Sequence, residues 1–506
     1  MQNYNLAWNK SFFTLSIALG AYLFSCQSKN SSEVIWKIDI PVIGSQSSPR
    51  AVDLNRDGIL DMVIGAGKNE FQYSDLGILA LDGRDGKILW SHESEDQVYG
   101  AATFLDINID GIDDVVIGGR GPHLRAIDGS NGSLLWKYDF QFENHPILQY
   151  ARYNFNTCAL IPDLTGDGIQ EILAVNGGNA VAEPYENVDR YPGVMMVINP
   201  VNGEIIVADT MPDGKESYMS PLYFENHLNN TNYILFGTGG ETISGNLYLG
   251  TLEDLLEQQL SRSKIIAMEE GHGFISTPVL ADINKDGILD IVAISHASTA
   301  LAIDGNTKKV IWRNTVPETE CSNSFSVGYF NKDDIPDFFT FVSKGVWPEN
   351  SGSIQVLFDG LTGEILYKES MGCSGFSSPV VYDLNKDGVD EAIISINEFD
   401  CNRKMDDRSF FSIENKLIAI DFKNDRIWPI DQTKGMKNIF STPWIGDLDA
   451  DGFLDIVHCQ YFSHSDILSF LGMRIKRIDT PIKIKQPVIW GAYLGSHYDG
   501  VYKRKK

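Results

Sequence analysis

Short apolar runs recur along the chain, each directly after an acidic segment. Four of them are Met62–Ile64, Val115–Ile117, Ile291–Ala293 and Ile456–Val457. They are rich in β-branched residues and are soon followed by a glycine or a polar residue, a pattern typical of short β-strands and too brief for helices. The chain is therefore expected to be built from many short strands joined by acidic loops.

A second pattern alternates with the first and consists of a strand, a tight Asp/Gly turn and another strand. It is clearest at 78–90, and returns at 124–136 and 301–312, with weaker copies at 197–207, 356–367 and 417–428. Together the two patterns give a unit of four strands, A to D. The acidic loop joins A to B, and the Asp/Gly turn joins C to D.

The number of units follows from the spacing of the acidic loops. Six clear copies begin at Asp53, Asp106, Asp163, Asp282, Asp383 and Asp447. The two wide gaps contain decayed copies, one at Tyr329–Asp337 and one marked only by the strand Tyr233–Gly237. Units of roughly 45 to 65 residues are the size of propeller blades or solenoid repeats. We therefore predict an all-β fold, an eight-bladed β-propeller of four-stranded antiparallel blades with calcium-binding A–B loops. A helical stretch at 252–261 is expected as an insertion in the fourth blade.

The acidic loops follow the pattern Asp-x-Asn-x-Asp-Gly-x-x-Asp. Oxygens at positions 1, 3 and 5 converge around a turn that Gly permits at position 6, position 7 offers a carbonyl, and position 9 offers a carboxylate. Hard oxygen ligands favour Ca²⁺, up to about six structural ions, whereas the alternative is an Asx-rich turn without metal. The predicted ligands are Asp53, Asn55, Asp57, Ile59, Asp61; Asp106, Asn108, Asp110, Ile112, Asp114; Asp163, Thr165, Asp167, Ile169, Glu171; Asp282, Asn284, Asp286, Ile288, Asp290; Asp383, Asn385, Asp387, Val389, Glu391; and Asp447, Asp449, Asp451, Phe453, Asp455.

The formal net charge of −27 agrees with this interpretation, because the six clear loops place 19 carboxylates at the predicted ligand positions. Carboxylates packed so closely repel one another without cations. The same acidity argues against nucleic acid as a partner.

The acidic loops resemble FG-GAP (VCBS-type) repeats, as in the calcium-binding propeller of integrin α chains. The Ala-x-Asp-x-x-x-Gly-x-x-x-Trp units resemble the blade repeat of quinoprotein-type propellers. These resemblances cover nearly all of residues 34–495 and imply a calcium-binding propeller. A quinoprotein cofactor site is not indicated, because the six cysteines include no vicinal pair.

The N-terminus indicates export. Lys10 precedes an apolar stretch, 12–24, and the sequence at its end is Leu23-Phe24-Ser25-Cys26. This arrangement resembles a bacterial lipoprotein signal. We predict a signal peptide at 1–25, a lipidated Cys26 with a tether at 26–33, a propeller at 34–495 and an external basic tail at 496–506. The protein is then anchored to the outer membrane; an ordinary signal peptide or a membrane anchor are the alternatives.

The candidate ligand face is formed by the B–C and D–A loops, at the opposite end of the blades from the acidic loops. Its long segments are 68–75, 139–158, 177–192 and 397–415. The candidate ligand residues in the loops of this face are Arg120, His123, Tyr150, Arg152, His272 and His296. Aromatic and polar side chains together suit sugars or peptides. The alternative is that these residues brace the loops.

No catalytic signature is present. We expect a non-enzymatic binding or assembly module at the bacterial envelope, with an envelope protein or a polysaccharide as partner. One alternative is a rhamnogalacturonan-type polysaccharide lyase, which some calcium-loop propellers resemble. Another is a scaffold like the propeller lipoprotein of outer-membrane protein assembly.

Two structural questions stay open in the sequence. Cys321 and Cys373 either form a disulfide or are free thiols. The eighth blade is completed either by the strand at Val34–Trp36 or by the one at Val488–Trp490.

Overall fold

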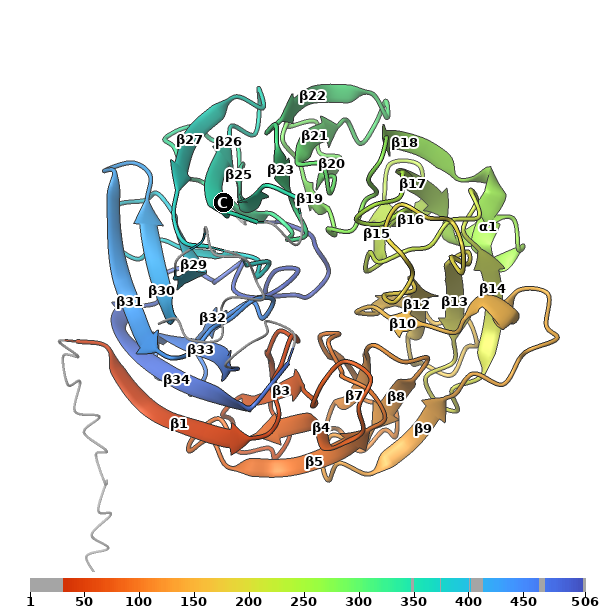
Figure 1. The fold of residues 1–506 in the computed structure, drawn as a ribbon, viewed down its shortest axis with the longest axis horizontal. Helices are drawn as coiled ribbons and strands as arrows, with labels where there is room; N and C mark the ends of the chain where they lie inside the picture. Colours follow the sequence, from red (N-terminus) through yellow and green to blue (C-terminus); the bar gives the residue numbers. More distant parts are fainter. Residues whose placement is uncertain are drawn as a thin grey trace, which may run out of the picture.

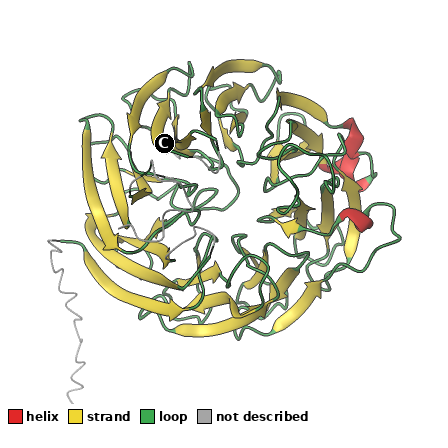
Figure 2. Ribbon diagram, in the orientation of Figure 1, coloured by secondary structure: helices red, strands yellow, loops and turns green. Residues whose placement is uncertain are grey.

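The computed structural model describes residues 31–346, 350–373, 375–399, 401, 413–463 and 469–503. In these residues the strands form eight antiparallel sheets arranged in a ring (Figure 1). Strands and loops make up almost the whole molecule (Figure 2). The predicted eight-bladed propeller is confirmed. The predicted signal peptide and Cys26 lie outside the described residues.

The first four blades run in chain order from the innermost strand outward. Blade 1 comprises β2 (Arg50–Val52), β3 (Asp61–Gly65), β4 (Ser74–Leu81) and β5 (Ile88–Ser94). Blade 2 comprises β6 (Thr103–Leu105), β7 (Asp114–Gly118), β8 (Leu124–Ile127) and β9 (Leu134–Tyr138). Blade 3 follows the short helix η1 (Leu148–Tyr150) and comprises β10 (Asn154–Phe155), β11 (Ala159–Ile161), β12 (Glu171–Gly177), β13 (Val194–Ile198) and β14 (Ile205–Thr210). Blade 4 comprises β15 (Leu222–Asn226), β16 (Thr231–Gly237), β17 (Gly245–Thr251) and β18 (Lys264–Glu269).

The second half repeats the arrangement. Blade 5 comprises β19 (Val279–Ala281), β20 (Asp290–Ile294), β21 (Thr299–Ile303) and β22 (Val310–Thr315). Blade 6 comprises β23 (Thr319–Glu320), β24 (Ser326–Gly328), β25 (Asp337–Lys344), β26 (Gly352–Phe358) and β27 (Ile365–Ser370). Blade 7 comprises β28 (Val380–Tyr382), β29 (Glu391–Glu398), β30 (Glu414–Asp421) and β31 (Arg426–Lys434). Blade 8 comprises β32 (Trp444–Gly446), β33 (Phe453–Phe462), β34 (Gly472–Lys483) and β1 (Glu33–Pro41).

The Asp/Gly turns hold neighbouring blades together. The Trp90 indole of β5 donates a hydrogen bond to the Gly129 carbonyl in the next blade's C–D turn, at 2.7 Å. Gly132 in that turn has φ +78° and lies so close to the Trp90 ring that a Cβ would meet it at 2.7 Å. Both the left-handed backbone and the close approach require glycine. Trp36 and Trp312 make the same bond to the turns of the blades that follow them, which explains the spacing of the second sequence repeat.

The ring is closed by the N-terminal strand. β1 pairs antiparallel with β34 and forms the outer edge of blade 8. Val34–Trp36 is therefore the closing segment, and Trp490 instead forms an isolated bridge with Val381 of an inner strand. This pairing covers the edge of β34 and joins the two ends of the chain in one sheet.

The predicted external tail is wrong for residues 496–503. This segment passes along the inner strands: the Leu280 amide donates to Gly500 O at 2.9 Å, and Val501 and Tyr502 are buried. The Tyr498 ring lies under the buried Arg50 guanidinium, 4.3 Å from ring centroid to Cζ. The last described residues therefore pack against the inner strands and do not form an external tail. Residues 504–506 lie outside the described part of the chain.

The predicted helical insertion in blade 4 is present as two short pieces. They are α1 (Leu252–Leu256), capped by Thr251 Oγ1, which accepts from the Asp254 amide at 3.1 Å, and η2 (Leu260–Arg262). No helix among the described residues is long and apolar enough to cross a membrane.

Candidate functional site

The acidic loops occupy the A–B connections, as expected. In the first loop, between β2 and β3, the Gly58 amide donates to Asp53 Oδ2 at 3.1 Å and the Asp57 amide donates to Asn55 Oδ1 at 3.0 Å. Gly58 has φ +81°, which is the conformation that the sequence pattern required. The glycine amides of the other five clear loops make the same bond to their first aspartate. The loops therefore share one geometry and form one face, called here the acidic rim.

In the clear loops of blades 1, 2 and 5 the ninth residue has a second role that sequence reasoning missed. Asp61 is buried, and its carboxylate accepts from the Leu54 amide and from the Gly83 amide in the C–D turn, both at 3.0 Å. Asp114 and Asp290 make the equivalent bonds in blades 2 and 5. Burial raises the pKa of each of these three carboxyls to about 6. This residue type therefore ties two turns of one blade together, whether or not it also contacts a cation.

Carboxylate oxygens converge most closely in blades 6, 7 and 8. Three acids per blade place one oxygen each within 4.8 Å of the others: Asp333, Asp337 and Asp359; Asp383, Asp387 and Glu391; and Asp447, Asp449 and Asp455. The sixth loop, described above as decayed, thus regains a third acid from Asp359 in the C–D turn. The Asp-Gly of that turn, which is part of the second repeat, was the signal that could have predicted it.

Several of these oxygens fit a bound cation. Asp337 Oδ2, Asp447 Oδ1 and Asp449 Oδ1 are buried and accept no hydrogen bond from the described residues. Burial raises the pKa of Asp337 to about 8. A buried carboxylate oxygen without a hydrogen-bond donor lowers the free energy of unfolding. Clusters of oxygen ligands of this kind bind hard divalent cations.

The chain also supplies cations of its own to the acidic rim. Arg477 of β34 is buried; its Nε donates to Asp455 Oδ1 at 2.9 Å and its Nη2 to Asp449 Oδ2 at 2.5 Å. Blade 8 has no C–D turn because β34 and β1 come from opposite ends of the chain. Arg477 therefore provides the donor that the turn amide gives to the ninth residue in blades 1, 2, 5 and 6. Arg84 contacts Asp57 in blade 1 at 3.0 Å, and Lys423 contacts Asp387 in blade 7 at 2.5 Å.

The opposite face, called here the variable rim, carries the long B–C and D–A loops. Arg120 Nη2 lies 2.6 Å from Glu70 Oε1, and its guanidinium covers the Tyr99 ring at 5.0 Å. His123 Nδ1 lies 2.7 Å from Asp139 Oδ1. These two candidate ligand residues join neighbouring loops to each other and so brace the rim.

The aromatic candidates form a separate cluster. The rings of Tyr150 and Tyr153 each stack near Tyr191, with centroids 6.0 and 6.2 Å apart. Arg152 lies over Phe140 at 4.8 Å. Tyr191 was missed because it is 38 residues beyond Tyr153 along the chain, and a stacking partner leaves no local signal.

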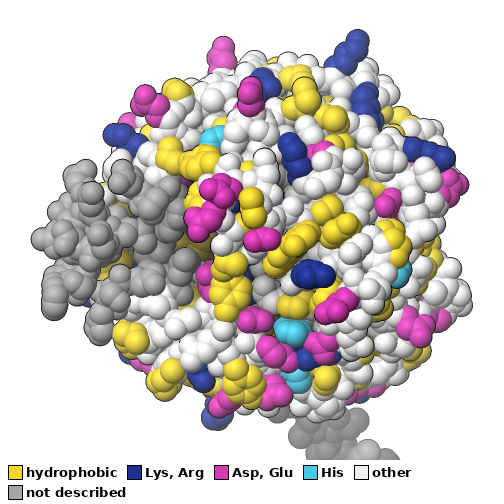
Figure 3. Space-filling model, turned by 45° about the vertical axis from the view of Figure 1, so that its right-hand side comes forward, with side chains coloured by type: hydrophobic (Ala, Val, Ile, Leu, Met, Phe, Trp, Pro, Cys, Tyr) yellow, Lys and Arg dark blue, Asp and Glu magenta, His cyan; other side chains and the backbone are white. Residues whose placement is uncertain are grey.

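The loop 177–192 presents apolar side chains to solvent. Val181, Tyr185 and Val188 are 69%, 66% and 64% exposed. The loop is nevertheless held in place: Arg190 pairs with the buried Glu216, and Asn179 Nδ2 donates to Asp189 O at 3.1 Å. On the part of the surface drawn in colour, Figure 3 shows hydrophobic and acidic side chains interspersed. Three apolar side chains on one braced loop make this loop a candidate interaction surface.

His272 and His296 are brought together on the variable rim, with ring centroids 5.5 Å apart. Glu320, which sequence reasoning did not select, lies beside them. The six candidate ligand residues thus separate into three groups: the Arg120 and His123 braces, the tyrosine cluster, and the histidine pair.

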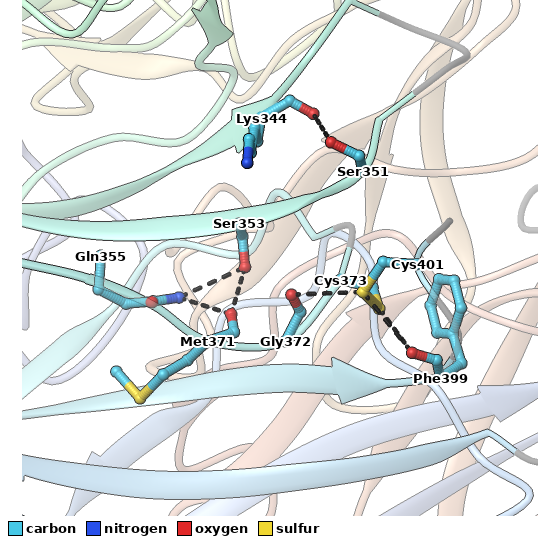
Figure 4. Close-up of a disulfide and its surroundings, with 9 residues drawn as sticks. All are labelled: Lys344, Ser351, Ser353, Gln355, Met371, Gly372, Cys373, Phe399 and Cys401. Atoms are coloured by element: carbon cyan, nitrogen blue, oxygen red, sulfur yellow. Dashed lines mark hydrogen bonds between the residues drawn. A yellow bond between two sulfur atoms is a disulfide. The ribbon is translucent and has the colours of Figure 1, made fainter. Parts of the chain in front are cut away.

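The possible Cys321–Cys373 disulfide is not formed. Cys373 instead pairs with Cys401, at a Cα–Cα distance of 5.4 Å (Figure 4). Cys401 follows the end of β29 and meets the loop between blades 6 and 7, whereas Cys321 is a free buried thiol. The bond fixes the base of the long B–C loop of blade 7.

Comparisons with known proteins agree with the architecture. A family model described as outer membrane protein assembly factor BamB matches residues 20–182. Protein FAM234A of Bos taurus is 22% identical over 177 residues, which is 32% of this chain and 31% of that protein. The match thus spans less than a third of the relative's length.

Two solved structures share the fold. The quinohemoprotein alcohol dehydrogenase from Comamonas testosteroni aligns with a TM-score of 0.55 and 10% identity, over 90% of this chain and 77% of that one. A europium-containing methanol dehydrogenase aligns with a TM-score of 0.54 and 11% identity, over 88% of this chain and 93% of that one. At such identities the likeness concerns the fold alone. The protein is an eight-bladed β-propeller, and its residues 20–182 are similar to the family model described as outer membrane protein assembly factor BamB.

Proposed function

We propose that this protein is a non-enzymatic binding or assembly module of the bacterial envelope, anchored through a lipid on Cys26, which binds its partner on the variable rim. The observation that carries the proposal is the braced loop 177–192, with Val181, Tyr185 and Val188 exposed. A rigid surface that presents apolar side chains loses little conformational entropy when a partner covers it. The BamB-like match of residues 20–182 supports an assembly role at the outer membrane.

The geometry favours binding over the lyase alternative. A lyase of that kind needs a Lys, Arg or His base beside a calcium-bound acidic sugar. His123, His272 and His296 lie on the variable rim, whereas the acidic loops lie at the other end of the strands. The histidine candidates for the base are therefore on the opposite face from the calcium loops, and Arg84, Lys423 and Arg477 on the acidic rim are paired with loop carboxylates.

Calcium, in this proposal, stabilises the acidic rim. Support comes from the converging carboxylates of blades 6 to 8 and from their buried oxygens without donors. Arg84, Lys423 and Arg477 offset only part of the charge of the loops. Bound Ca²⁺ supplies the remaining positive charge and stiffens each A–B connection.

The test is to cross-link the tagged full-length chain in its native envelope with Ca²⁺ present, and to identify what co-purifies. The double variant Val181→Asp, Val188→Asp should lose the partner. A matched double variant on the acidic rim, Ile109→Asp with Leu228→Asp, should retain it, because these side chains are 74% and 75% exposed and lie in A–B loops, at the opposite end of the strands from the variable rim.

Equal capture by both double variants would contradict the variable rim as the binding surface. Polysaccharide recovered without protein would identify a glycan as the partner. Release of unsaturated, ultraviolet-absorbing ends from that polysaccharide would favour the lyase alternative.

A further inference from the structure

We propose that His272, His296 and Glu320 form a binding site for a first-row divalent metal ion such as Zn²⁺. Each residue offers one ligand atom, and the three atoms lie within 4.8 Å of one another. His272 lies between β18 and β19, His296 follows β20, and Glu320 is in β23. The site thus joins loops of blades 4, 5 and 6 on the variable rim, away from the acidic loops.

The hydrogen bonds of the two imidazoles define which nitrogens face the site. His272 Nδ1 lies 2.5 Å from Glu241 O, and His296 Nδ1 lies 3.1 Å from Cys321 O. A carbonyl oxygen can only accept, so each Nδ1 carries the proton and each Nε2 carries the lone pair. Donation of the other ring nitrogen to a backbone carbonyl is the arrangement that orients histidines bound to metals.

The distances leave room for an ion. His296 is 2% exposed, and its Nε2 has no hydrogen-bond partner among the described residues. Glu320 Oε1 lies 3.7 Å from that nitrogen, beyond hydrogen-bond range. Two ligands at about 2.0 to 2.1 Å from a tetrahedral ion are roughly 3.3 Å apart. A small inward movement therefore completes the coordination.

The backbone holds the three ligands in place before any ion binds. The His296 amide donates to Gly273 O, the residue after His272, at 2.9 Å. The Cys321 amide, one residue after Glu320, donates to His296 O at 2.9 Å. These bonds connect the three ligand-bearing segments directly, so the site is preorganised.

The ligand set selects the metal class. Imidazole nitrogen suits zinc and its transition-metal neighbours, whereas Ca²⁺ prefers oxygen alone. Three protein ligands also leave one tetrahedral position open for water or for a group of a binding partner. The inference is independent of the proposed function, because it concerns the ion alone.

The test is a titration of the full-length chain with ZnCl₂ in excess Ca²⁺, followed by calorimetry and by melting temperature. We expect one tight site and a Zn²⁺-dependent rise in melting temperature. His272→Ala and Glu320→Gln should each weaken Zn²⁺ binding by more than about 100-fold. Loss of a residue that only hydrogen-bonds to a metal ligand already lowers metal affinity by about 10- to 100-fold. His123→Ala, a control at another partly buried histidine of this rim, should leave binding unchanged.

Cobalt provides a readout in the unmodified chain. Co²⁺ should give the visible absorption of a tetrahedral site with nitrogen and oxygen ligands, and Zn²⁺ should abolish it. The proposal is overturned if the wild-type chain shows neither the cobalt band nor a Zn²⁺-dependent melting shift. It is equally overturned if His272→Ala, folded as judged by its melting in Ca²⁺ alone, binds Zn²⁺ as tightly as His123→Ala.

Discussion

The two rims of the propeller are built on different principles. On the acidic rim, each loop makes its bonds within nine residues, as in Asp53–Asp61, and the neighbouring turn adds one more. On the variable rim, the contacts join distant residues, as in Arg190 with Glu216 and Cys373 with Cys401. The structure of the acidic rim is repeated from blade to blade and can be predicted from short sequence motifs. The contacts of the variable rim differ from loop to loop and follow no repeated motif.

The largest effect is expected at Arg477, where the acidic rim departs from its own repeat. Arg477→Met removes the guanidinium donor from the buried Asp455 carboxylate and from the partly buried Asp449 carboxylate, so the free energy of unfolding should fall by about 3–5 kcal/mol. Chemical denaturation without calcium measures this loss. Because the variant loop has lost its internal cation, added Ca²⁺ should restore more stability to the variant than to the wild type. Equal gains would show that Arg477 and calcium do not share these carboxylates.

On the variable rim, the disulfide gives the next largest effect. Cys373→Ser with Cys401→Ser opens a loop of 28 residues, for which chain entropy predicts a loss of about 3–4 kcal/mol in the free energy of unfolding. Calcium should not compensate for this loss, which distinguishes it from that of Arg477→Met. A Cys321→Ser variant serves as the control, since its thiol is free. An equal loss in the control would point to buried thiol packing instead of the crosslink.

The sequence predicted the repeated part of the molecule well, because its information is local. The strands, the eight blades and the positive φ of Gly58 all follow from short motifs. Long-range pairings were not accessible in this way. Cys401 and Glu320 are typical surface or strand residues until the fold places them beside Cys373 and His296. The tail was misjudged for the same reason: four terminal basic residues concealed the preceding Tyr498–Tyr502 segment, which packs against the inner strands.

A smaller effect is expected between blades 7 and 8, away from both rims. Burial, with the nearby Lys476, lowers the pKa of His458 below its usual 6.5. The folded state therefore holds His458 neutral while the unfolded chain takes up a proton below pH 6.5. The contribution of neutral His458 to the free energy of unfolding is therefore fully present above pH 6.5 and is lost as the pH falls. The loss is about 1.5 kcal/mol between pH 6.5 and 5.

The check is denaturant unfolding of wild type and His458→Gln at both pH values. Between the two pH values, the free energy of unfolding of His458→Gln should change by about 1.5 kcal/mol less than that of the wild type, whatever the absolute stability of the variant. His227→Gln, whose side chain is 81% exposed, should match the wild type. A slope in His458→Gln as steep as in the wild type would exclude His458 as its source.

The most direct test of the division between the rims is the melting temperature of the full-length chain in excess Ca²⁺ and in chelator. One site filled at a hundred times its Kd adds about 2.7 kcal/mol to the free energy of unfolding, and several sites add together. We predict a clear rise with Ca²⁺, smaller with Mg²⁺, and the same rise in the disulfide-free variant. An unchanged melt in chelator would contradict the account, since the acidic rim would then be held by its backbone bonds and side-chain cations alone.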